Sequence, residues 1–155
     1  MKNAVLNSDI NQSAGSWKGR QGLWLSLFLA AAAFVLMLPL FLGGPRNGYD
    51  TLFHLANVDK LFEQLQQTPL FPSRVVGGAA NDFGYGTYLF YPPLSHFTAA
   101  YLNFFTRDTI LSIQITHFLF LALSGMTMFW ASARISGCRR VGFMSGLVFM
   151  LFPYH

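Results

Sequence analysis

The feature that most limits the possible folds is an uncharged run at residues 22–42, GLWLSLFLAAAAFVLMLPLFL. An α-helix rises 1.5 Å per residue, so about 20 apolar residues cross the roughly 30 Å hydrocarbon core of a bilayer. The run therefore predicts a first transmembrane helix. A cleaved signal peptide is the alternative, but its apolar region spans about 7–15 residues and ends at small residues. Here the alanines, Ala30 to Ala33, lie in the middle of the run.

The composition also favours a membrane protein. Hydrophobic residues make up 53% of the 155-residue chain and charged residues only 10%, whereas about a quarter of the residues in soluble domains are charged. A soluble domain of this size exposes roughly 30% of its chain surface and needs polar side chains to cover it. This excludes an ordinary soluble enzyme. The single cysteine, Cys138, excludes a disulfide-stapled module.

The basic residues predict the orientation of the chain. They concentrate in two stretches, a polar leader at residues 1–21 and a turn at residues 132–140. The turn follows a second apolar segment, residues 109–131, which predicts a second span. Lys and Arg favour the cytoplasmic side of a membrane. Both basic stretches are therefore expected in the cytoplasm, and residues 43–108 between the two spans are expected outside it. Such short clusters do not predict nucleic-acid binding.

Residues 141–155 begin a third apolar segment that is too short to cross a bilayer. Its apolar part covers only about 20 Å as a helix. We expect a truncated third transmembrane helix of a longer parent protein; the alternative is a genuine three-helix protein whose last helix is short. The expected fold is an all-α membrane protein with about three transmembrane helices and a large outer loop.

The outer loop is expected to contain two amphipathic juxtamembrane helices, near residues 50–67 and 93–105. At 100° per residue, the first of them gathers its apolar side chains on one side: Leu55, Val58, Leu61, Phe62 and Leu65. We expect that side to lie on the outer leaflet of the membrane. Asp50, His54 and Asn57 fall at the border between the apolar and polar faces.

Asp50 and His54 are the candidate pair for chemistry. A carboxylate and an imidazole four residues apart on a helix lie one turn apart, where each changes the proton affinity of the other. The pair fits acid/base chemistry or metal binding, although Asp50 also fits a plain helix N-cap. Gln114 and His117 are polar residues within the second span. Ionisable residues there often mark function, but for His117 we favour a packing role against a neighbouring helix.

Several segments of the chain resemble a known family. The order of Asp50 to His54, then TPLFPSRVVGGAANDFGYGTYLFYPPL, then ARISGCRR is similar to the N-terminal part of polytopic GT-C-type glycosyltransferases. The segments HLANVDKLFEQLQQTPLFPSR and YGTYLFYPPL most resemble bacterial membrane proteins labelled 6-pyruvoyl-tetrahydropterin synthase-related. Protein O-mannosyltransferases and aminoarabinose transferases share the general plan more distantly. The resemblance covers residues 22–155.

The resemblance implies the N-terminal fragment of a multi-pass glycosyltransferase of the bacterial inner membrane, which takes a sugar from a polyprenyl-phosphate donor. Asp50 would act as the catalytic base, or as a metal ligand, with His54 beside it. Arg74 would contact the donor phosphate, because a guanidinium pairs with two phosphate oxygens. The resemblance implies no organic cofactor and leaves a divalent metal open. The loop has no D-x-D pair, and the histidines form no evident zinc-binding cluster of a soluble pterin synthase.

Two other classes of protein stay open. The first is a non-enzymatic membrane scaffold, an assembly partner or a degenerate relic of such a transferase. The second is a transporter subunit, which only Gln114 and His117 suggest. The expected partners are the lipid bilayer, the polyprenyl-phosphate sugar donor and the remaining helices of the parent protein.

Overall fold

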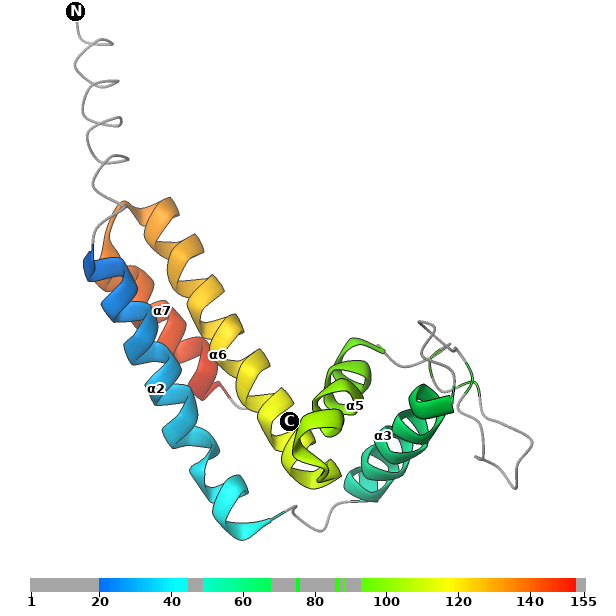
Figure 1. Ribbon diagram of the computed structural model, residues 1–155. Helices are drawn as coiled ribbons and strands as arrows, with labels where there is room; N and C mark the ends of the chain where they lie inside the picture. Colours follow the sequence, from blue (N-terminus) through cyan, green and yellow to red (C-terminus); the bar gives the residue numbers. More distant parts are fainter. Residues whose placement is uncertain are drawn as a thin grey trace, which may run out of the picture. The chain divides into compact units, whose positions relative to one another are not determined.

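The computed structural model describes residues 20–44, 49–67, 75, 86, 88 and 93–152, and every element in these ranges is a helix (Figure 1). In chain order the helices are α2 (Arg20–Gly43), α3 (Tyr49–Gln67), α5 (Leu94–Thr106), α6 (Thr109–Ser136) and α7 (Arg139–Leu151). For this part of the chain, the predicted all-α fold is confirmed.

Two of the described helices are long and apolar enough to cross a membrane. They are the segment Gln21–Gly43 of α2, with a mean hydropathy of 2.5, and α6, with a mean hydropathy of 1.5. Both contain the runs from which the sequence predicts spans. α7 is a helix of 13 residues, which is about 20 Å long and shorter than the hydrocarbon core of a bilayer.

The basic turn between α6 and α7 is shorter than the sequence predicts. α6 continues past the expected end at residue 131, so Arg134 belongs to its last turn. Arg139 and Arg140 already form the start of α7. Only Gly137 and Cys138 connect the two helices, because Gly137 takes a positive φ of 69° that ends α6.

The chain divides into two compact units, which are described separately. The first unit comprises Met1–Leu36 and Phe120–His155, and the second comprises Met37–Leu119. In the first unit, small residues let α6 and α7 approach closely: a Cβ on Gly142 would lie 2.6 Å from the carbonyl oxygen of Phe129. α2 joins them through a hydrogen bond of 3.2 Å from the Trp130 indole to Ser26 Oγ.

In the second unit, the apolar face of α3 packs against α5. The core of this unit consists of Val58, Leu61, Leu65, Tyr88, Phe97, Ala99 and Ala100. The sequence predicts that this face of α3 lies on the membrane surface, whereas the structure buries it against another helix. The small side chains of Ala99 and Ala100 explain the difference, because they allow the two helices to approach closely.

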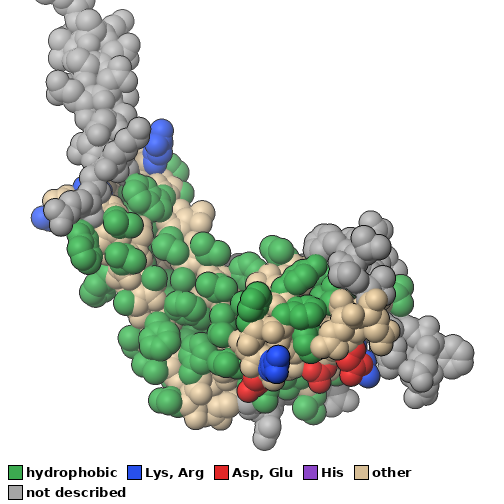
Figure 2. All heavy atoms as spheres, in the orientation of Figure 1, with side chains coloured by type: hydrophobic (Ala, Val, Ile, Leu, Met, Phe, Trp, Pro, Cys, Tyr) green, Lys and Arg blue, Asp and Glu red, His purple; other side chains and the backbone are tan. Residues whose placement is uncertain are grey.

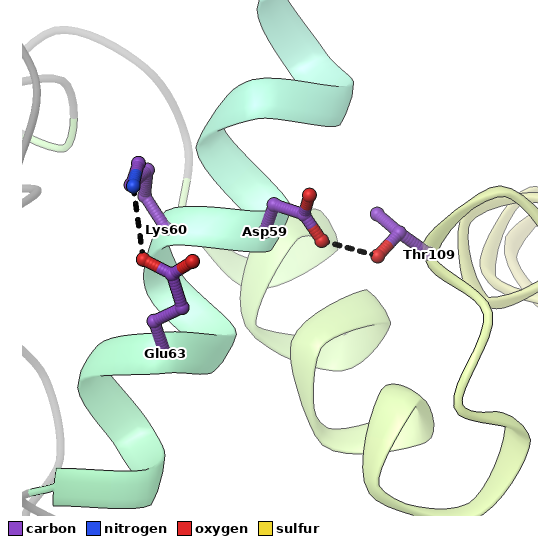
Figure 3. Close-up of polar contacts among 4 residues, drawn as sticks. All are labelled: Asp59, Lys60, Glu63 and Thr109. Atoms are coloured by element: carbon purple, nitrogen blue, oxygen red, sulfur yellow. Dashed lines mark hydrogen bonds and ion pairs between the residues drawn. The ribbon is translucent and has the colours of Figure 1, made fainter.

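Polar contacts fix α3 and α5 to the start of α6, and Figure 3 shows the contact from α3. Thr109 Oγ1 donates to the carboxylate of Asp59 at 2.5 Å and accepts from Asn103 Nδ2 at 3.0 Å. Asp108 caps α6 by accepting a hydrogen bond of 3.0 Å from the backbone N–H of Leu111. Arg107, which ends α5 just before Asp108, adopts a left-handed backbone conformation with φ 53°. These contacts hold three helices of the second unit in one arrangement.

Large hydrophobic side chains cover much of the visible helical surface, and the few acidic side chains gather over α3 and the turn before α6 (Figure 2). On α2, Trp24 is 62% exposed and Val35 is 61% exposed. Contiguous exposed apolar surface of this kind marks contact with a membrane or with other helices. The apolar exterior therefore supports the membrane assignment made from composition.

Candidate functional site

Three of the four histidines in the chain line one cavity in the second unit. His54 of α3, His96 of α5 and His117 of α6 surround a space of about 220 Å³, together with the hydroxyl-bearing residues Ser95 and Thr116. The fourth, His155, lies outside the described residues. Residues from three helices far apart in the sequence thus converge on one partly polar cavity.

His54 and His96 form a direct pair. Nδ1 of His54 and Nε2 of His96 share a hydrogen bond of 2.9 Å, and the ring centroids are 5.1 Å apart. One of these nitrogens must donate and the other must accept, so at least one imidazole of the bonded pair is neutral. The contact fixes the orientation of the His54 ring, which the sequence predicts as part of the site.

Aromatic side chains hold His96 in place. It is only 6% exposed, and the ring of Tyr88 packs against it at 5.6 Å and against Phe97 at 5.4 Å. Burial raises the pKa of the Tyr88 phenol well above its ordinary value. Tyr88 therefore stays neutral at physiological pH and serves as a packing residue.

Asp50 lies in the first turn of α3, and its side chain is exposed. Within the described part of the chain, no hydrogen bond or ion pair of the Asp50 carboxylate is present, so the spacing to His54 has not produced a direct bond between them. An exposed carboxylate without such a bond can accept a proton from an incoming hydroxyl. Arg74, the predicted phosphate contact, lies outside the described residues.

A second, mostly apolar cavity of about 160 Å³ adjoins the first. His54, Ile113 and His117 line both, and the residues that the second cavity adds include Leu40, Leu55 and Ile110. The neighbouring residue Gln114 donates from Nε2 to the backbone carbonyl of Leu40 at 2.8 Å. Because Leu40 lies in the last turn of α2, this bond satisfies a carbonyl that lacks a partner within the helix. Gln114 therefore has a structural role.

The described residues offer no ready metal centre. No group of three His, Cys, Asp or Glu side chains among them is arranged to hold a metal ion. His54 and His96 alone give two ligands, whereas catalytic zinc sites use three protein ligands. The chemistry that fits the arrangement is hydrogen bonding and proton transfer by imidazole and carboxylate.

His96 was not among the site residues predicted from the sequence, although the pattern of residues on α5 indicates a buried polar face. His96 and Asn103 lie seven residues apart on α5, with Ala99 and Ala100 between them, and all four are buried. Polar side chains at this spacing on a face with small residues indicate a polar stripe facing another helix. Pairing of that stripe with His54 depends on how α3 and α5 pack, which the helical period does not predict.

No protein-family model, curated protein or solved structure matches the chain.

Proposed function

We propose that this chain is part of a membrane glycosyltransferase, in which residues 37–119 form the acceptor side of a site for transfer from a polyprenyl-phosphate sugar. The observation that supports it is the position of Asp50, exposed in the first turn of α3, one turn before His54. His54 in turn is oriented by His96 and lines the cavity shared with His117. A free carboxylate beside an oriented imidazole suits acid/base work.

In the proposed reaction, the Asp50 carboxylate takes the proton of an acceptor hydroxyl. The acceptor oxygen forms a bond to the anomeric carbon of the sugar as the bond from that carbon to the donor phosphate breaks. The electron pair of the broken bond leaves with the polyprenyl phosphate, and the anomeric centre inverts. His54 lies one turn further along α3, where a hydrogen bond from its imidazole would stabilise the negative charge that develops on the phosphate.

The proposed site is on the outer side of the inner membrane. Basic residues lie in the leader, residues 1–21, and in residues 132–140, at the end of α6 and the start of α7, and they favour the cytoplasm. Residues 37–119 lie between these two stretches and include most of the acidic residues: Asp50, Asp59, Glu63, Asp82 and Asp108. The separation of charge supports an outer location for Asp50 and His54.

The test uses the protein expressed from its natural reading frame, in isolated membranes supplied with radiolabelled polyprenyl-phosphate sugars. We expect Asp50→Asn to lower the rate of sugar release by about 100-fold or more, because general-base catalysis contributes about 10²–10⁴-fold. Glu63→Gln is the matched control. It removes an exposed carboxylate from the same helix, one that pairs with Lys60 at the surface.

Two results would contradict the proposal. The first is an Asp50→Asn variant that transfers sugar at the rate of the unmodified protein. The second is an unmodified protein that inserts into membranes but releases no sugar from any donor of this class, which would favour the membrane scaffold.

A further inference from the structure

A separate pocket lies in the first unit, whereas the three histidines of the candidate site belong to the second unit. It is open, has a volume of about 490 Å³, and is lined by residues of α2 and α7. At one end lie Gln21, Arg139 and Arg140, and the other lining residues include Trp24 and Met144. The proposed sugar transfer does not use any of these residues.

Polarity changes along the pocket in the same direction on both helices. Gln21 lies in the first turn of α2, and Arg139 and Arg140 lie in the first turn of α7. One turn further along each helix, the lining becomes apolar, with Trp24 on α2 and Met144 on α7. The pocket thus has a cationic end, at two helix N-termini, and an apolar end.

The cationic end presents two arginine side chains, Arg139 and Arg140. Arg139 Nη1 donates to Gln21 Oε1 at 2.8 Å, which positions one guanidinium at the mouth of the pocket. The sequence has no Asp or Glu from residue 10 to 49 or from residue 109 to 155. Neither α2 nor α6 nor α7 therefore supplies a carboxylate, and the N-terminal ends of α2 and α7 add further positive potential.

We propose that this pocket binds an anionic phospholipid, with its phosphate at Arg139 and Arg140 and its acyl chain along Trp24 and Met144. Trp24 is 62% exposed and Met144 is 60% exposed, so both present apolar surface to a chain. Basic pockets between helices at the cytoplasmic end are suited to anionic lipid headgroups, and tryptophan is enriched at that depth. A free phosphate would leave the apolar end of the pocket unused.

The test titrates the purified full chain in a mild detergent with phosphatidylglycerol, phosphatidylcholine or glycerol 3-phosphate and counts bound molecules by native mass spectrometry. We expect phosphatidylglycerol to bind at least fivefold more tightly than phosphatidylcholine, since each basic residue contributes about fivefold in affinity for anionic lipid. Glycerol 3-phosphate is expected to compete only at far higher concentration. These comparisons use the unmodified chain and depend on no variant.

Arg140→Gln should weaken phosphatidylglycerol binding by about fivefold and leave phosphatidylcholine unchanged. Arg134→Gln is the matched control: it removes the same charge from the neighbouring end of α6, at an exposed residue that does not line the pocket. Equal affinity for the two lipids would overturn the proposal. So would equal loss in both variants, which would indicate general charge attraction, or full displacement by glycerol 3-phosphate at equal concentration, which would indicate a free-phosphate site.

Discussion

Cys138 occupies the N-cap position of α7 and is fully exposed. The nearby backbone N–H groups of Val141 and Arg140 lower the pKa of the Cys138 thiol, because they favour the thiolate. These are donors that the first turn of a helix leaves without carbonyl partners. The thiol is thus activated by its place in the helix.

We predict that Cys138 reacts with iodoacetamide at neutral pH faster than an ordinary exposed thiol. Its rate should reach half of its maximum at a pH below the usual cysteine value of about 8.5, since a lowered pKa gives more thiolate at each pH beneath it. The measurement is the pH–rate profile of the detergent-solubilised chain. Ser136→Cys in a Cys138→Ser background is the control at the end of α6, and an equal midpoint for the two thiols would contradict the account.

The histidine pair shows how far the sequence predicts the site. The spacing of Asp50 and His54 follows from the helical period, and the structure keeps both in α3. His96 is 42 residues further along the chain from His54. No local pattern specifies that contact, because it depends on the packing of α3 against α5. The roles of Asp50 and His54 in catalysis stay predictions.

At the scale of single elements, the positions of the helices were predictable from the sequence. What each apolar helix face packs against was not always predictable. α2, α3 and α6 contain the segments that hydrophobic period and turn residues predict, and α5 begins one residue after its predicted start. The surface covered by the apolar face of α3 was not predictable, since a membrane and a second helix both satisfy the same pattern. The end of α6 was set by the conformation of Gly137 rather than by the loss of apolar residues.

The close contact between α6 and α7 gives a prediction for Gly142. An added Cβ would lie 2.6 Å from the Phe129 carbonyl oxygen and 2.9 Å from the Ala133 backbone nitrogen, so the helices must move apart. We expect Gly142→Ala to destabilise the chain by about 1–3 kcal/mol. Thermal unfolding followed by circular dichroism in detergent measures the effect.

Gly43→Ala provides the control, because a Cβ on Gly43 meets no described atom within 4 Å. It should leave the melting temperature unchanged or raise it slightly, as alanine favours a helix more than glycine does. If the Gly142→Ala variant has the same melting temperature as the unmodified chain, α6 and α7 do not pack as described.

At the scale of the whole molecule, both functional proposals depend on where the few charged residues lie along the chain. The basic residues at Arg134, Arg139 and Arg140 flank the turn after α6, whereas Asp50 and Glu63 belong to the segment between the two long apolar helices. In the proposed topology, the membrane separates these two groups into different compartments. The proposed sugar-transfer site and the proposed lipid pocket therefore both depend on the same orientation of the chain.

The most direct test of that orientation is the labelling of single cysteines in intact cells, in a Cys138→Ser background. With a membrane-impermeant maleimide, Lys60→Cys on α3 should be labelled from outside, and Ser136→Cys at the end of α6 should be labelled only after lysis. A permeant maleimide should label both and serves as the control for reactivity. Labelling of Ser136→Cys in intact cells, with Lys60→Cys protected, would contradict an outer location for Asp50 and His54.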